Sequence, residues 1–173
     1  MRCAMTDREY PDFSDGIWDD GEWISWDWIN GQLDEQELKA EFPEASPELI
    51  ELFQRFVEIA IDHRDLTGNY LQVWGELGEL YGEIKFGVKR HRPNTQGSDG
   101  KLGNDFVEIK TISPEKSVHK VQVKRAGNFN KLLVVRINET FEFEAKMIDR
   151  CVLAKGTGKH ASISWQAMPT PKK

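Results

Sequence analysis

Glu108 and Lys110 lie two residues apart in the apolar run from Phe106 to Ile112, where a purely structural strand would carry valine or threonine. Residues two apart in a β-strand share a face, so the carboxylate and the amine are expected to point the same way, and Asp105 the other way. Such a pair suits either a surface ion pair or metal-assisted chemistry on a phosphate. In the second case the amine balances charge that develops on the phosphoryl oxygens.

The residues before this strand predict a tight hairpin that brings a second acid to the same place. Gly103-Asn104 favours a two-residue turn, and Leu102 then pairs with Asp105. Counting back along both strands puts Asp99 opposite Glu108, with Cβ atoms about 4.5–5.5 Å apart. Two carboxylates at that distance repel unless a proton or a cation lies between them.

The expected cation is Mg²⁺, a hard ion that one or two carboxylates hold together with water, and Mn²⁺ is expected to substitute. The ion would polarise a phosphate and lower the pKa of water. Lys110 would help to hold or deprotonate the nucleophile. This inference depends on the turn, because a four-residue loop over 101–104 would put Gly97 opposite Glu108.

Helices are expected before the hairpin. Residues 34–41 predict a short helix, and residues 46–63 predict an amphipathic one with Ser46 as its N-cap. A third helix is expected from after Asn69 to about Phe86. It contains three glycines, Gly75, Gly78 and Gly82. Each weakens a helix by about 1 kcal/mol relative to alanine, which indicates that another backbone or a ligand approaches closely.

The third helix also carries Glu76, Glu79 and Glu83 along one edge of its apolar stripe. Like charges at these spacings repel. The carboxylates therefore either face solvent or lie under a cation or a basic partner.

The net charge of −6 is unevenly divided. Residues 1–83 hold 5 Lys and Arg against 21 Asp and Glu, and residues 84–173 hold 18 against 8. Clustered basic residues are typical of proteins with a polyanion partner, although two halves of opposite charge can also neutralise each other within one molecule. The candidate nucleic-acid contacts are Lys89, Arg90, Arg92, Lys120, Gln122, Lys124, Arg125, Asn130 and Lys131.

The chain length predicts one compact domain, in which residues 1–68 pack on a core of residues 69–173. Residues 1–31 are expected to be loop-like, and their tryptophans either pin this segment to the domain or form a platform for a sugar or a base. Strands are expected after residue 95, with residues 141–153 compatible with strand or helix. Helices followed by strands favour an α/β, α+β-like fold.

These residues together resemble the PD-(D/E)xK nuclease superfamily over about residues 74–137, with Ser98 in place of the family's proline before Asp99. The resemblance implies a restriction-endonuclease-like mixed central sheet flanked by helices, here with a helical N-terminal extension. It implies a Mg²⁺-dependent endonuclease acting on DNA, less often RNA, in restriction, repair or defence. The implied catalytic residues are Glu79, Asp99, Glu108 and Lys110, with the three acids as metal ligands and Glu76 and Glu83 as competitors of Glu79.

Other functions stay open. A chain of the same fold could bind nucleic acid without turnover or need a partner, and a carbohydrate-active enzyme would use paired glutamates with the tryptophans. The acidic N-terminal segment could lie over a basic groove, or bind a second subunit or another protein. Cys3 and Cys151 form no disulfide framework, and the chain carries no signal-peptide or membrane-span pattern. A cytoplasmic location is therefore expected.

Overall fold

The computed structural model describes residues 15–92 and 97–169. Residues 1–14, with Cys3 and the start of the acidic segment, lie outside that range. The chain divides into two compact units, Met1–Pro43 and Glu44–Lys173. The division falls after Pro43, so the helix expected from Ser46 belongs to the same unit as the strands.

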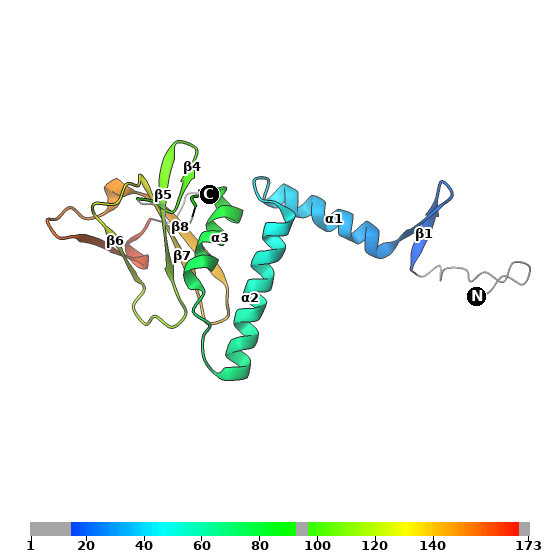
Figure 1. Ribbon diagram of the computed structural model, residues 1–173, viewed down its shortest axis with the longest axis horizontal. Helices are drawn as coiled ribbons and strands as arrows, with labels where there is room; N and C mark the ends of the chain where they lie inside the picture. The colour runs from blue at the N-terminus through cyan, green and yellow to red at the C-terminus, as the bar shows by residue number, and fades with distance from the viewer. Residues whose placement is uncertain (1–14, 93–96, 170–173) are drawn as a thin grey trace, which may run out of the picture. The chain divides into compact units, whose positions relative to one another are not determined.

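The first unit is a β-hairpin that leads into a helix (Figure 1). Its elements are β1 (Gly16–Asp19), β2 (Glu22–Ser25) and α1 (Trp26–Glu41). The expectation of a loop was therefore wrong from residue 16 onward, and the first helix begins well before residue 34. The missed signal is Asp20-Gly21: both residues have positive φ, 41° and 88°, which a primed two-residue turn requires.

Two further helices belong to the second unit, α2 (Pro47–Thr67) and α3 (Trp74–Phe86). The predicted N-cap of α2 is confirmed, because Oγ of Ser46 accepts a hydrogen bond of 3.3 Å from the N–H of Leu49. The helix ends at Gly68 in the left-handed conformation, with φ 69°. None of the helices in the described part of the chain is long and apolar enough to cross a membrane.

A five-stranded mixed sheet forms the centre of this unit, in the order β3-β4-β5-β7-β8 (Figure 1). The strands are β3 (Lys89–Arg90), β4 (Gly100–Leu102), β5 (Asp105–Ile112), β7 (Lys131–Ile137) and β8 (Phe143–Asp149). Only the pairing of β5 with β7 is parallel among these neighbours. The mixed α/β fold with a mixed central sheet and flanking helices is thus confirmed.

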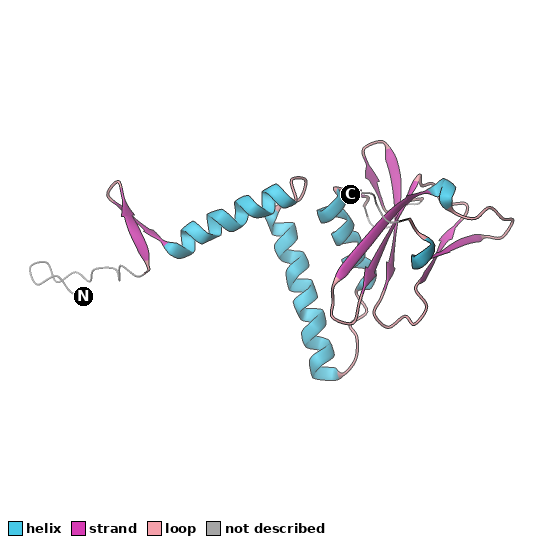
Figure 2. Ribbon diagram, turned by 180° about the vertical axis from the view of Figure 1, so that it is seen from behind, coloured by secondary structure: helices cyan, strands magenta, loops and turns pink. Residues whose placement is uncertain are grey.

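Layers cover both faces of the sheet (Figure 2). Helices α2 and α3 pack on one face, where Leu133 and Val135 of β7 point. On the other face lies a two-stranded sheet of β6 (Lys120–Lys124) and β9 (His160–Ser164), against Leu132 and Val134 of β7. Strand β7 is therefore buried on both sides, as its continuous apolar run predicts.

Residues 141–153, whose sequence is compatible with strand or helix, form the strand β8 over Phe143–Asp149. Its residues pair antiparallel with β7, Leu132 with Ile148 and Val134 with Lys146. The connection from β5 to β7 runs through β6 and contains no α-helix, which agrees with the strand and loop pattern of residues 113–131.

Two of the three glycines of α3 let the helix lie close to the sheet. A Cβ at Gly78 would clash with Oγ1 of Thr111, and one at Gly82 would lie 2.9 Å from Cδ2 of Leu133. Gly75 faces open space. The close approach of α3 to β5 and β7 positions the acids of the helix near Lys110.

Candidate active site

The hairpin of β4 and β5 has the register that the two-residue turn predicts. Leu102 pairs with Asp105 and Gly100 with Val107, so the four-residue alternative is excluded. The recorded pairing ends at Gly100, and Asp99, one residue before β4, donates a 3.0 Å hydrogen bond from its N–H to the carbonyl of Val107, the residue opposite Gly100. Its carboxylate accepts a 2.6 Å hydrogen bond from the N–H of Ile109.

Lys110 lies between the two carboxylates of the hairpin. Its Nζ is 2.7 Å from Oε1 of Glu108 and 3.7 Å from Oδ2 of Asp99. The three side chains are only 17–34% exposed, so water screens this cluster less than it would a surface ion pair. The structure thus brings together three of the four residues expected at the site.

Glu79 reaches the same place from α3. It lines a hollow of about 340 Å³ together with Asp99 and Lys110. Burial raises the pKa of Glu79, and the negative charges of Asp99 and Glu76 raise it further against the opposing effect of Arg90 and Lys110. Glu79 therefore holds its proton more tightly than an exposed glutamate does.

The competing acids of α3 have another partner. Arg90 on β3 donates to Glu83 at 2.5 Å and to Glu76 at 2.7 Å. Burial alone would lower the pKa of Arg90, but these hydrogen bonds outweigh it and raise the pKa. Glu76 and Glu83 thus anchor β3 to α3, and Glu79 is the acid of this helix that lines the hollow.

A second hollow, of about 750 Å³, continues the site towards β6. It is lined by Asp99, Glu108 and Lys110, and also by Lys124. A third, of about 380 Å³, is lined by Lys110, Lys120 and Gln122 with no acidic residue among its lining. Lys110 borders all three hollows, which are lined by carboxylates and by residues of β6.

The candidate nucleic-acid residues separate into two groups. Lys120, Gln122 and Lys124 alternate with the buried Val121 and Val123, so they lie on the exposed face of β6. Within residues 15–92 and 97–169, the side-chain amines of the two lysines have no hydrogen-bond or ion-pair partner. These side chains are available to an anionic ligand.

Of the remaining candidates, Arg90, Arg125, Asn130 and Lys131 are occupied by structural contacts. Arg125 donates to the carbonyl of Ala154 at 2.6 Å. Oδ1 of Asn130 accepts from the N–H of Phe106 at 2.9 Å. Hydrogen bonding to Asp149 raises the pKa of Lys131, and Asp105 adds to this effect. Lys89 and Arg92 are exposed on and just after β3, and Arg90 binds the two glutamates of α3.

Carboxylate oxygens are hard ligands of the kind that Mg²⁺ prefers. Asp99 and Glu108 would hold the ion, with water completing its coordination, and Glu79 lies at the edge of the same hollow. In the described part of the chain, no three His, Cys, Asp or Glu side chains lie close enough together to form a metal site.

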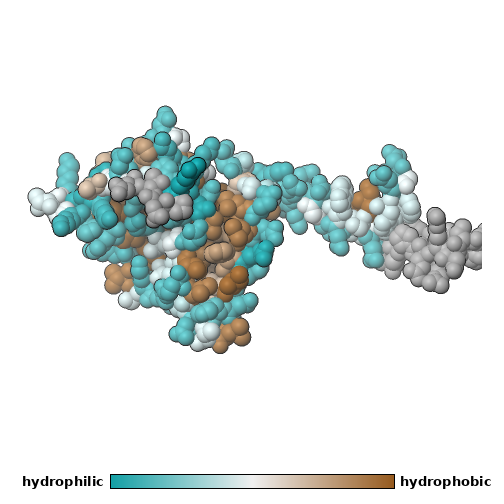
Figure 3. Space-filling model, in the orientation of Figure 1, coloured by the Kyte–Doolittle hydropathy of each residue, from teal (hydrophilic) through white to brown (hydrophobic). Residues whose placement is uncertain are grey.

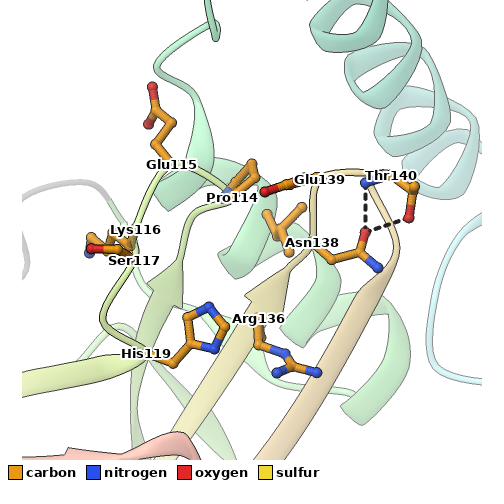
Figure 4. Close-up of a pocket in the computed structure, with 10 residues that line it drawn as sticks. Pro114, Glu115, Lys116, Ser117, His119, Arg136, Asn138, Glu139 and Thr140 are labelled. Carbon is orange, nitrogen blue, oxygen red and sulfur yellow. Dashed lines mark hydrogen bonds between the residues drawn. The ribbon is translucent and has the colours of Figure 1, made fainter.

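Lys116 is a site residue that the sequence did not single out. It follows β5 in the connection to β6 and lines two of the hollows that Lys110 borders. It also lines a hollow of about 540 Å³ beyond the ends of β5 and β7 (Figure 4). There Oδ1 of Asn138 is occupied by the N–H and hydroxyl of Thr140. Sequence periodicity predicts the faces of helices and strands, and it could not place a lysine that lies in a loop.

No protein-family model matches the chain. The comparison with curated proteins gives no match either.

Proposed function

We propose that this chain is a metal-dependent nuclease that hydrolyses phosphodiester bonds, in DNA in preference to RNA. The observation that carries the proposal is the position of Lys110, with Nζ 2.7 Å from Glu108 and 3.7 Å from Asp99. The two carboxylates can bind a cation, and the amine between them can bind a phosphate. A surface ion pair needs neither Asp99 nor the hollows around it.

The roles of the side chains follow from their chemistry. Asp99 and Glu108 accept hydrogen bonds from an attacking water, and their negative charges stabilise a positive charge beside that water. Lys110 donates to a non-bridging phosphoryl oxygen and balances the charge that grows there as the bond to the leaving oxygen breaks. Mg²⁺, when bound by the two carboxylates, would supply Lewis-acid polarisation of the phosphate.

The exposed face of β6 supports a nucleic-acid substrate. Lys120 and Lys124 border the hollows that Lys110 also borders, so a phosphate backbone over Lys110 would continue onto β6. Contacts of this kind position the substrate and carry no sequence information. A carbohydrate substrate would leave these lysines and Lys110 without a role.

Cleavage of supercoiled plasmid and of single-stranded oligonucleotides with Mg²⁺, Mn²⁺ or EDTA tests the proposal. Wild type is expected to cut with either metal and to stop in EDTA, and Lys110→Met and Glu108→Gln are expected to lose cutting. Lys101→Met is the matched control, because Lys101 lies on the neighbouring strand β4 over the ring of Phe106. Circular dichroism establishes that each variant is folded.

A second function, a nucleic-acid-binding module of the same fold that lacks turnover or needs a partner, is favoured by one observation. No three-ligand metal site is found among residues 15–92 and 97–169. A folded wild type that binds DNA in a salt-dependent way, yet cuts no substrate with either metal, would replace the nuclease with this module.

A further inference from the structure

A further hollow, of about 460 Å³, lies at the end of β6 and is lined by none of the candidate catalytic residues. Its apolar lining is part of the core. Val123 of β6 pairs with Ala161 of β9, and Phe129 and Leu153 join them from two loops, all four buried. Small-molecule sites occupy about 300–1,000 Å³ and are mostly apolar, with a few polar groups that fix the ligand. The hollow has the size and the floor of such a site.

The charged side chains of this hollow are all basic. They are Lys124, Arg125, Arg150 and Lys155, and no Asp or Glu stands among the described residues that line it. The side-chain amines of Lys124 and Lys155 have no hydrogen-bond or ion-pair partner among residues 15–92 and 97–169. In Figure 3 hydrophilic residues predominate at the end of the second unit where Figure 1 labels β6. The hollow therefore favours a ligand that carries negative charge.

The two arginines of the hollow are held by backbone carbonyls. Arg150 donates to the carbonyls of Gly127, Phe129 and Arg125. Arg125 donates to the carbonyl of Ala154, and its Nε is buried without a hydrogen-bond partner among the described residues. Neither guanidinium forms an ion pair within that part of the chain. Because a carbonyl is neutral, an anion bound in the hollow would supply the negative charge that both arginines lack.

Arg150 also provides a fixed planar surface. Its guanidinium carbon lies 4.8 Å from the centre of the Phe129 ring, and its hydrogen bonds hold it there. Bases of single-stranded nucleic acids stack on aromatic rings and on guanidinium groups of this kind. An aliphatic acid would use the apolar floor and the charges but not the planar groups. A planar base joined to a phosphate matches all three features.

We infer that this hollow is a nucleotide-binding site, with the base on the apolar floor and the phosphate at Lys124 and Lys155. Lys124 also lines the hollow of about 750 Å³ that contains Asp99 and Glu108. The nucleotide can therefore be part of a strand bound at the candidate active site, or a free mononucleotide. The choice of a nucleotide rests on the proposed function, whereas the apolar floor and the basic rim do not.

Isothermal titration calorimetry of the full chain in EDTA tests the inference. The probes are the deoxynucleoside 5′-monophosphates, the matching nucleosides, which lack the phosphate, and 2-deoxyribose 5-phosphate, which lacks the base. The tightest mononucleotide is expected to bind at least about tenfold more tightly than its nucleoside or the sugar phosphate. A sugar phosphate that binds as tightly as the mononucleotide, or no binding of any mononucleotide, would overturn the inference.

Charge reversal at the rim tests the position of the site. Lys155→Glu is expected to raise the dissociation constant of the mononucleotide at least about tenfold, because it replaces a phosphate-binding amine with a like charge. Lys159→Glu is the matched control, since Lys159 is an exposed lysine of the same loop and does not line the hollow. Thermal melting shows that both variants fold. An equal loss of affinity in the two variants would overturn the assignment to this hollow.

Cys151 gives an independent measurement, because it is an exposed free cysteine that lines the hollow. In a chain with Cys3→Ser, a saturating mononucleotide is expected to slow the alkylation of Cys151 by iodoacetamide. Inorganic phosphate at the same concentration is expected to leave the rate unchanged. A rate that the mononucleotide also leaves unchanged would show that it binds elsewhere and would overturn the inference.

A labelled single-stranded oligonucleotide in EDTA distinguishes the two sources of the nucleotide. If a base of the bound strand occupies the hollow, the mononucleotide displaces the oligonucleotide and Lys155→Glu weakens its binding. If the hollow takes a free mononucleotide, the oligonucleotide stays bound. A chain that binds the mononucleotide but cuts no DNA with Mg²⁺ would keep this site and overturn the nuclease proposal. A chain that cuts DNA but binds no mononucleotide would overturn this site alone.

Discussion

The carboxylate of Asp99 accepts a hydrogen bond of 2.6 Å from the backbone N–H of Ile109. This bond fastens an acid that precedes β4 to the middle of β5, between Glu108 and Lys110. The distance from Asp99 to Lys110 is therefore set by the backbone of the hairpin. Substitutions of Asp99 can separate the structural contribution of this side chain from its chemical contribution.

Asp99→Asn is expected to keep the structural contribution and lose the chemical one. Its side-chain carbonyl still accepts from Ile109, whereas Asp99→Ala removes the acceptor and is expected to cost about 1 kcal/mol of folding free energy beyond the cost of Asp99→Asn. Both variants lose the charge and are expected to lose metal-dependent cleavage. Urea denaturation and plasmid cleavage measure the two effects, and an Asp99→Asn variant that cuts like wild type would contradict the assignment.

Glu79→Gln is expected to stabilise the protein at neutral pH. Because burial and the neighbouring carboxylates raise the pKa of Glu79 in the folded state, the folded chain binds its proton more tightly than the unfolded chain. Stability from this group is present below the unfolded pKa and is lost as pH rises through the folded pKa. Glutamine does not ionise, so the Glu79→Gln variant avoids that loss of folding stability. Its stability gain over wild type should therefore disappear below the ordinary pKa of glutamate.

Urea denaturation of wild type and Glu79→Gln across the acidic to neutral range measures this difference. Glu58→Gln, an exposed glutamate of α2, is the control. A gain for Glu79→Gln that does not change with pH would show that the side chain acts through packing and not through its charge.

The glycines of α3 are expected to respond in opposite directions to alanine. Gly78→Ala brings a methyl group into Oγ1 of Thr111 and is expected to cost about 1–3 kcal/mol. Gly75→Ala meets open space and is expected to gain up to about 1 kcal/mol from helix propensity. Denaturant midpoints compare the two, and equal shifts would argue against the close approach of α3 to β5.

Removal of the unpaired lysines of β6 is expected to change the salt dependence of DNA binding. Each phosphate contact contributes about −0.9 to the slope of log affinity against log salt for duplex DNA. Lys120→Ala and Lys124→Ala should each reduce the slope by about that amount. Lys131→Ala is the control because Asp149 and Asp105 already bind that amine. If the slope of Lys131→Ala changes as much as those of Lys120→Ala and Lys124→Ala, the result would contradict DNA binding on the exposed face of β6.

Local signals were sufficient to predict the hairpin and its register. The Gly103-Asn104 turn fixes which residues oppose each other, and the alternation along β5 fixes which faces they share. The N-cap Ser46 likewise marks the start of α2 from a single side chain. Features that depend only on residues close together in the chain could therefore be predicted from the sequence.

Relationships between distant elements were not accessible. Residues 143–149 are compatible with strand or helix until β7 offers them a pairing edge. That Arg90 binds Glu76 and Glu83, which leaves Glu79 facing the hollow, depends on where β3 lies against α3. Lys116 lines the same hollow as Lys110 only because of the path of the connection after β5. Tertiary packing decided each of these.

The parallel pairing of β5 with β7 also has a kinetic consequence. The β4–β5 hairpin joins residues a few positions apart, whereas the parallel pair joins Val107 to Lys131 across the whole connection that contains β6. Non-local pairing has to close a long loop before its contacts form, so it is expected late in folding. A nascent chain would thus assemble its cluster of acids first and its cationic surface last. Affinity for a polyanion would then appear only when folding is complete.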